Sequence, residues 1–363
     1  MRKLIILCLT LAALTVPVLA ADIQAEQGTL FGADGLRDGL TGQAAELMED
    51  YDPLEQADFS AGVVQILADA AGQSGSAVKS AAAAMLKILV ILVLCQTVDA
   101  LGQERTGQIT VMAAALGITA CCASDLHTMI GLGQTTMEEI SNFSGLLLPV
   151  MAAAATATGA AVSAGAMYTV AAFFSNLLIR FSRYLLIPLV YAYIGLAMAD
   201  GALGQDKLSK MRELLGWVIR NGLKAVMYLF TGFLTVTGLL SGSADAAALK
   251  AAKAAISTAV PVVGGIISGA AETILASAGL LRSAIGTFGM LAVLSYFILP
   301  FFKIGISYLA FKVTAALGGM VDNRHSALLE AIASAMGFLL AMTGSCAVMS
   351  LLSCCCFFKA VQP

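Results

Sequence analysis

The chain has 363 residues, of which 59% are hydrophobic and 12% are charged, with a mean hydropathy of +0.88 and a formal net charge of −3. A soluble domain needs far more charge on its surface, so this composition excludes a water-soluble globular protein and predicts a chain embedded in lipid. The acidic balance, without any cluster of Lys and Arg interleaved with aromatic residues, argues against nucleic-acid binding.

The N-terminal residues have the pattern of a secretory signal. Two basic residues precede an apolar run at 4–16, and a small residue stands before a cleavage point ahead of Ala21. We therefore predict a signal peptide at 1–20. An uncleaved anchor helix is the alternative, because the rest of the chain is also expected in the membrane.

An acidic segment follows at 21–78. Eleven Asp or Glu residues lie between 21 and 70, where Arg37 is the single basic residue, and apolar side chains recur at helical spacing over 57–71. Acidic residues barely oppose export, whereas clustered Lys and Arg resist it. We expect a small, partly helical segment on the extracytoplasmic side.

The remainder, 79–358, is a polytopic membrane domain with a short tail at 359–363. About 20 apolar residues cross a bilayer as a helix, so the fold class is all-α with about seven to nine spans. The number of helices within 144–199 stays open, because Arg180 and Arg183 are the only charges there. The apolar candidates are 81–98, 109–124, 144–164, 166–179, 184–199, 225–243, 285–302, 304–320 and 331–353.

An amphipathic helix is predicted at 205–224, within a loop that begins at residue 200. Apolar side chains line one face and basic side chains lie mostly off it, with Trp217 near the middle. Because basic loops stay in the cytoplasm, we place 200–224 in the cytoplasmic interface. A solvated helical loop is the alternative.

The segment 244–283 is too polar for a simple span and too apolar for an ordinary loop. Pro261 removes a backbone donor inside an apolar stretch, and two glycines follow it. Broken helices at membrane depth persist only against protein or water, so we predict a re-entrant or pore-facing element, with a surface hairpin as the alternative. The proposed functional element consists of Lys250, Lys253, Pro261, Gly264 and Gly265.

Charges inside or at the ends of spans form a second group of candidates. Each costs a few kcal/mol at the bilayer centre unless it reaches the interface, pairs or faces water. Lys87 and Lys303 lie where their side chains can reach the interface. Arg180, Arg183 and Lys312 are the better candidates for a polar path or an assembly contact.

No catalytic, cofactor-binding or metal-binding residues are predicted, and the chain is not expected to be an enzyme. The two histidines lie far from any nucleophile pattern, and no phosphate-binding loop or dinucleotide fingerprint occurs. The cysteines lie in the signal or in apolar stretches without zinc spacing, so we interpret them as packing residues. Acylation of the run at 354–356 is a minor alternative.

The region 223–289 resembles stage III sporulation protein AE of endospore-forming bacteria. The resemblance rests on the run 260–265 (Val-Pro-Val-Val-Gly-Gly) together with Lys250, Lys253 and Glu272, and a looser match begins at Pro149. It spans roughly 80–355, together with the family's leading signal sequence. The proline–glycine run is the specific part of this pattern.

The resemblance implies a multi-pass protein of the mother-cell membrane around the forespore. It implies membership in a secretion-like channel complex needed for late forespore gene expression. The implied partners are sister subunits of the stage III sporulation A group, including a separate ATPase and ring-forming proteins, and, indirectly, stage II sporulation protein Q.

Two other functional classes compete with that interpretation. A stand-alone secondary permease is the alternative, which requires paired carboxylates in the membrane or an inverted repeat. An intramembrane enzyme ranks third, because the spans lack a convincing catalytic pair.

Overall fold

The structure is a computed structural model that describes residues 32–55, 57–101, 107–157, 161–203, 208–236, 264–321 and 323–359. Throughout these ranges the ordered elements are helices, without a strand, as the all-α prediction requires. The predicted signal at 1–20 lies outside the described residues. The helices are α2 (Asp34–Asp38), α3 (Gly42–Leu47), α4 (Phe59–Gln73), α5 (Gly75–Leu101), α6 (Gly107–Ala157), α7 (Ala161–Phe181), the π-helix η1 (Ser182–Leu186), α8 (Ile187–Leu203), α9 (Ser209–Val236), α11 (Gly264–Val321) and α12 (Asn323–Lys359).

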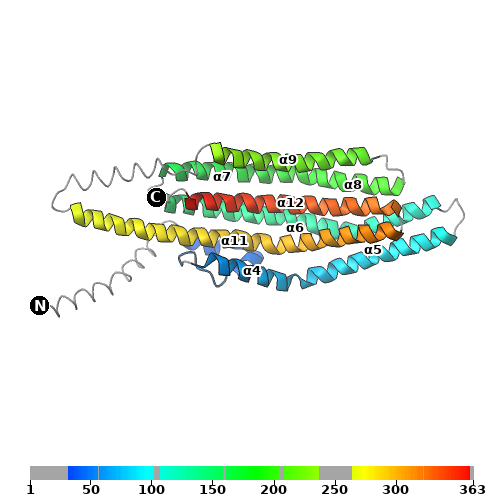
Figure 1. Ribbon diagram of the computed structural model, residues 1–363, viewed down its shortest axis with the longest axis horizontal. Helices are drawn as coiled ribbons and strands as arrows, with labels where there is room; N and C mark the ends of the chain where they lie inside the picture. Colours follow the sequence, from blue (N-terminus) through cyan, green and yellow to red (C-terminus); the bar gives the residue numbers. More distant parts are fainter. Residues whose placement is uncertain are drawn as a thin grey trace.

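The long helices form an elongated bundle with their axes side by side (Figure 1). The helical rods α5, α6, α7–α8, α9, α11 and α12 alternate in direction within the described part of the chain. The C-terminal ends of α5, α8 and α11 point to one end of the bundle. The C-terminal ends of α6, α9 and α12 point to the other.

Five helical stretches are long and apolar enough to cross a membrane: 75–98, 109–157, 168–203, 283–320 and 325–355, counted over the described residues. The predicted seven to nine spans are therefore not confirmed. The predicted spans 109–124 and 144–164 fall largely within α6, and those at 285–302 and 304–320 lie in α11. Polar side chains separate the apolar halves in the sequence, but they do not interrupt the backbone hydrogen bonds of a helix.

The two longest helices exceed the thickness of a bilayer. With 51 residues in α6 and 58 in α11, a rise of 1.5 Å per residue gives lengths of about 76 Å and about 87 Å. A hydrocarbon core is about 30 Å thick. Part of the bundle must therefore extend beyond the membrane.

Proline shapes the junction between α7 and α8. Pro188 has no N–H to bond to the carbonyl one turn earlier, which would kink a regular helix. The chain absorbs this locally through η1, where the Ile187 N–H bonds to the Ser182 carbonyl five residues back. The predicted spans 166–179 and 184–199 thus become one helical rod.

The central helices are α11 and α12, which pack against each other and against α6. Close approach is possible because Gly289 of α11 faces the buried side chain of Leu147 on α6. Nearby, the rings of Phe143 and Tyr296 lie 5.7 Å apart. Apolar side chains from all the long helices complete the buried core.

The described parts of the predicted amphipathic helix 205–224 and of the predicted span 225–243 share one helix, α9, which covers Ser209–Val236. This helix lies along α8, with its axis parallel to the bundle (Figure 1). A helix lying in the plane of a membrane surface would instead cross the bundle axis. The cytoplasmic position of 200–224 remains a prediction.

The acidic segment folds onto the bundle through α2, α3 and α4. The Thr41 N–H donates a hydrogen bond to the Tyr296 hydroxyl over 2.8 Å, and Gly62 faces Leu291 of α11. Asp58 caps the N-terminus of α4 by accepting from the Ser60 N–H. The carboxylates exposed on this segment are Asp38, Glu46, Glu49, Asp50, Glu55, Asp58 and Asp69.

Candidate functional site

The candidate site is the set of ionisable side chains that lie among the apolar helices. Charges are costly in hydrocarbon, so each is a functional candidate together with the partner that stabilises it. The structure shows how these side chains are arranged around the bundle.

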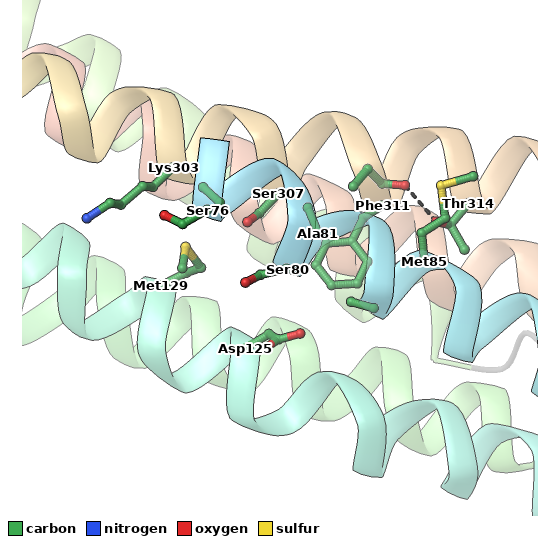
Figure 2. A pocket seen from close by; sticks show the side chains of 13 residues that line it. Ser76, Ser80, Ala81, Met85, Asp125, Met129, Lys303, Ser307, Phe311 and Thr314 are labelled. Carbon is green, nitrogen blue, oxygen red and sulfur yellow. Dashed lines mark hydrogen bonds between the residues drawn. The ribbon is translucent and has the colours of Figure 1, made fainter. Parts of the chain in front are cut away.

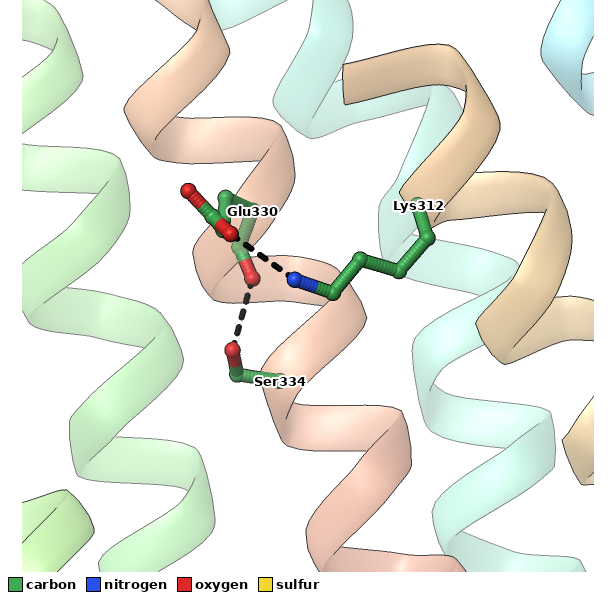
Figure 3. Close-up of polar contacts among 3 residues, drawn as sticks. All are labelled: Lys312, Glu330 and Ser334. Atoms are coloured by element: carbon green, nitrogen blue, oxygen red, sulfur yellow. Dashed lines mark hydrogen bonds and ion pairs between the residues drawn. The ribbon is translucent and has the colours of Figure 1, made fainter. Parts of the chain in front are cut away.

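Lys312 joins α11 to α12. Its ammonium donates to Oε1 of Glu330 over 2.8 Å, and the Ser334 hydroxyl donates to the Glu330 backbone carbonyl over 2.8 Å (Figure 3). The side chains of Lys312 and Glu330 are 39% and 64% exposed. The ion pair therefore lies at the surface of this isolated chain, although both residues belong to candidate spans.

Arg183 joins η1 to α6. Its Nη1 lies 2.8 Å from Oε1 of Glu138, with both side chains about half exposed. Arg180 is one helical turn earlier and is also exposed, without an ion pair to any residue that the structure describes. The π-helix therefore presents its arginine to a carboxylate on a neighbouring helix.

Among the residues that the structure describes, the most buried ion pair joins α8 to α9. Oδ2 of Asp200 lies 3.7 Å from Nη1 of Arg212, with side chains 3% and 16% exposed. Oδ1 of the same carboxylate accepts the Leu208 N–H over 3.1 Å, just before α9 begins. Among the described residues, Oδ2 has no hydrogen-bond partner. Asp200 thus ties the start of α9 to the end of α8.

A groove lined by both polar and apolar side chains opens between α5, α6 and α11 (Figure 2), with a volume of about 170 Å³. Lys303 and Asp125 lie along it, and neither forms an ion pair with a residue that the structure describes. Ser76 and Ser80 stand one turn apart on α5, opposite Ser307 of α11. The remaining lining residues are Ala77, Ala81, Ala84, Met85, Met129, Ala310, Phe311 and Thr314.

The predicted functional element lies mostly outside the described residues. This holds for Lys250, Lys253 and Pro261. Gly264 and Gly265 are the first two residues of α11, which continues as a helix to Val321. The structure therefore does not test the proposed break, and the role of these residues remains a proposal.

Sequence reasoning found the basic members of two ion pairs, Arg183 and Lys312, but not their acidic partners. Glu138 and Glu330 stand in separate helices, 45 and 18 residues away along the chain. Asp200 was also missed, although a carboxylate next to an apolar run was its visible signal. Whether Arg180, Arg183 and Lys312 line a path or contact partners remains a prediction.

No group of three or more His, Cys, Asp or Glu side chains suited to a metal ion occurs within the described residues. The buried histidine, His325, has its Nε2 3.1 Å from the Val111 carbonyl. It therefore contacts the backbone of α6. What the described arrangement offers is a set of paired and unpaired charges among membrane helices.

These features define a multi-pass α-helical membrane protein with ionisable side chains inside its spans. The chain belongs to the stage III sporulation protein AE family, whose sequence pattern matches residues 45–360. It is a sporulation-related membrane protein, as the resemblance predicted.

A curated relative supports the same family. The chain is 23% identical over 238 residues to stage III sporulation protein AE of Bacillus subtilis (strain 168). That match covers 64% of this chain and 60% of the relative, which is less than two thirds of the relative's length. No solved structure matches the chain.

Proposed function

We propose that this protein is a membrane subunit of the secretion-like channel complex that joins mother cell and forespore during sporulation. Its place is the mother-cell membrane around the forespore, and its role is to support late forespore gene expression. The proposed partners are sister stage III sporulation proteins, including a separate ATPase and ring-forming subunits, with stage II sporulation protein Q contacted indirectly.

The observation that carries this proposal is the placement of ionisable side chains among candidate spans of a sporulation-family protein. Lys312 with Glu330 and Arg183 with Glu138 form ion pairs that remain partly exposed on the isolated chain. An ion pair that stays exposed within an apolar span needs water or a further polar group at its open side. A larger assembly can supply either of them.

A stand-alone permease is the weaker alternative. Transporters of that class hold their substrate near the bilayer midplane with broken helices, usually between related repeats. Within the described residues, α6 and α11 remain helical on both sides of Pro149 and Pro300, the prolines in their apolar halves. This continuity favours the subunit over the permease.

The test is purification of the tagged full-length chain from sporulating cells in mild detergent. We expect the sister subunits to co-purify, whereas an unrelated multi-pass protein with the same tag should recover none of them. Recovery of the chain alone, at normal abundance and from cells that sporulate normally, would contradict the assignment and favour the permease.

A further inference from the structure

The helix α5 fixes where the bilayer lies along the bundle. Its candidate span, Gly75–Val98, has 24 residues, which gives a length of about 36 Å at a rise of 1.5 Å per residue. A hydrocarbon core is about 30 Å thick, so α5 crosses it once with little to spare. A single residue separates α5 from α4, which exposes the carboxylates of Asp58 and Asp69. The start of α5 therefore lies at the membrane surface, on the side of the acidic segment.

The groove between α5, α6 and α11 begins at that surface. Because α5 and α11 run in the same direction, Ser76 lies at the level of Lys303, and Met85 lies at the level of Thr314 (Figure 2). The distance along α5 from Ser76 to Met85 corresponds to about 14 Å of depth. The groove thus reaches almost half of the way through a hydrocarbon core of about 30 Å.

Contacts of α5 with both of its neighbours close the groove at the deep end. Gly117 of α6 faces Ile91, and Gly318 of α11 faces Leu92, which is buried. Since neither glycine has a side chain, α5 packs closely on α6 and α11 at this level. Nearer the start of α5, the three helices leave the space of about 170 Å³. The groove is therefore open toward the acidic segment and closed toward the middle of the bilayer.

The lining is polar at the mouth and apolar at the floor. From mouth to floor, the side chains in Figure 2 are Lys303 and Ser76, then Ser80, Ser307 and Asp125, then Phe311, Met85 and Thr314. Neither Lys303 nor Asp125 forms an ion pair with a residue that the structure describes. Ionised side chains without a partner are costly in hydrocarbon, and so are hydroxyls that lose their hydrogen bonds to water. The mouth of the groove therefore requires water.

We propose that this groove is a water-filled vestibule, which opens on the side of the acidic segment and brings water and small ions to Asp125 within the membrane. Its volume of about 170 Å³ has room for about five water molecules at about 30 Å³ each. That size suits water and small ions rather than a large solute. The vestibule goes beyond the proposed function, because it depends only on the membrane placement of α5.

The first test compares two alanines on opposite faces of α5. Ala84 lines the groove, whereas Ala82 does not. Two residues separate them, which is about 200° around a helix. Ala82 stands one turn from Val78 and from Leu86, whose side chains are 50% and 65% exposed on the isolated chain. This apolar face of α5 meets lipid. Ala82 is the more exposed of the two alanines on the isolated chain, so exposure alone would predict the opposite order of reactivity.

Ala84→Cys and Ala82→Cys are made in the full-length chain with the native cysteines replaced by alanine. Open membrane fragments, in which both surfaces are accessible, are treated with the charged thiol reagent MTSES. Thiolates react, and a thiol in apolar surroundings hardly ionises, so Ala84→Cys should react about tenfold faster or more than Ala82→Cys. Ile91→Cys, beyond the floor of the groove, should react as slowly as Ala82→Cys.

The second test fills the groove. Ser307→Phe places a ring among the lining residues and should slow the reaction of Ala84→Cys to the rate of Ala82→Cys. Leu309→Phe is the matched control, because Leu309 lies on the same helix, is 60% exposed and does not line the groove. This control should leave the rate unchanged.

A third measurement keeps the native cysteines. Met129 lines the groove, and hydroxyl radicals generated in water convert methionine to its sulfoxide. In native membranes Met129 should be oxidised, and Ser307→Phe should protect it whereas Leu309→Phe should not. The side of the opening follows from intact cells, where Ser76→Cys and Glu55→Cys should react with MTSES from the same side of the membrane.

Four results would overturn the vestibule. They are a rate at Ala84→Cys no higher than that at Ala82→Cys, a rate at Ile91→Cys equal to that at Ala84→Cys, equal oxidation of Met129 in the native chain and in Ser307→Phe, and reaction of Ser76→Cys only from the side opposite to Glu55→Cys. Each can occur while sister subunits still co-purify, so failure of the vestibule is distinguishable from failure of the proposed function.

Discussion

Lys312 and Glu330 link the two central helices of the bundle, with the lysine ammonium 2.8 Å from a glutamate carboxylate oxygen. They lie on the consecutive helices α11 and α12, 18 residues apart in sequence. An ion pair across a helical hairpin fixes which turns of the two helices face each other. It therefore contributes to the register of the most extensively packed helix pair in the described chain.

Reversing either charge of this pair should destabilise the protein. Lys312→Glu would set two carboxylates against each other, and Glu330→Lys two ammonium groups. We expect a loss of about 1 kcal/mol or less in aqueous surroundings, since both side chains are partly exposed. Thermal unfolding in detergent should show a lower melting temperature for each single variant and recovery in the double swap. Additive losses in the double swap would contradict a direct pairing.

Adding a side chain at Gly289 should disturb the contact between α11 and α6. A Cβ there would stand 2.5 Å from Cδ2 and 2.7 Å from Cδ1 of Leu147, which is fully buried and has little room to move. Overpacking of this kind costs about 1–3 kcal/mol. Gly289→Ala should therefore lower the melting temperature.

Gly305→Ala, on the same helix, is the matched control. No heavy atom lies within 4 Å of a Cβ built at that position. Alanine is about 0.5–1 kcal/mol better than glycine inside a helix, so this variant should be neutral or stabilising. Adding Leu147→Ala to Gly289→Ala should recover part of the loss. Equal effects at positions 289 and 305 would show that local packing is not responsible.

The alternating direction of the rods predicts the topology of the chain. With α9 counted, six rods run back and forth within the described residues, so the C-terminus should share a side with the acidic N-terminal segment. Two cysteine variants test this: Glu55→Cys, and a chain with one cysteine added after Pro363. Both cysteines should react with an impermeant maleimide in intact cells. A cysteine replacing Leu203 should react only after permeabilisation. Labelling of Leu203→Cys in intact cells would reverse the predicted orientation.

The cap on α4 should make the acidic segment sensitive to low pH. Hydrogen bonds from the Ser60 hydroxyl, and from the Ser60 and Ala61 N–H groups, lower the pKa of Asp58 below its ordinary value of 3.8. A lowered folded pKa means that this stabilisation is present above pH 3.8 and is lost as pH falls through the lowered value. Asp58→Asn keeps a capping oxygen, so it should retain α4 but lose this pH dependence. Hydrogen exchange of the α4 backbone amides measures this pH dependence. Asp58→Ala removes the cap, so its α4 amides should exchange faster at every pH.

The predicted element around Pro261 can be tested through backbone shape. Pro261→Ala should let a helix continue, and Leu at Gly264 and Gly265 adds bulk where close approach is expected. We expect these variants to accumulate at normal abundance but to fail in late forespore gene expression. The charge reversals Lys250→Glu and Lys253→Glu should have the same effect. Normal spore yield in all these variants would show that 244–283 is not the functional centre.

Composition and periodicity alone determined the class of this protein. A chain with so few charges can bury its apolar surface only in lipid, and backbone groups in lipid must bond within helices, so an all-α membrane fold follows. The run around Pro261, Gly264 and Gly265 was distinctive enough to indicate the family. The amphipathic pattern at 205–224 could also be recognised in the sequence, because the helical period depends only on local geometry.

Tertiary structure decided which helices continue and which charges meet. Residues between two apolar runs suggested loops, but polar side chains do not break a helix, so α6 and α11 run through them. The pairing of Lys312 with Glu330 and of Arg183 with Glu138 depends on which helices lie side by side. The exposed face of α9 likewise emerged only when α8 and α12 packed against the opposite face. Periodicity shows that a helix has two faces, but only packing determines which of them is left uncovered.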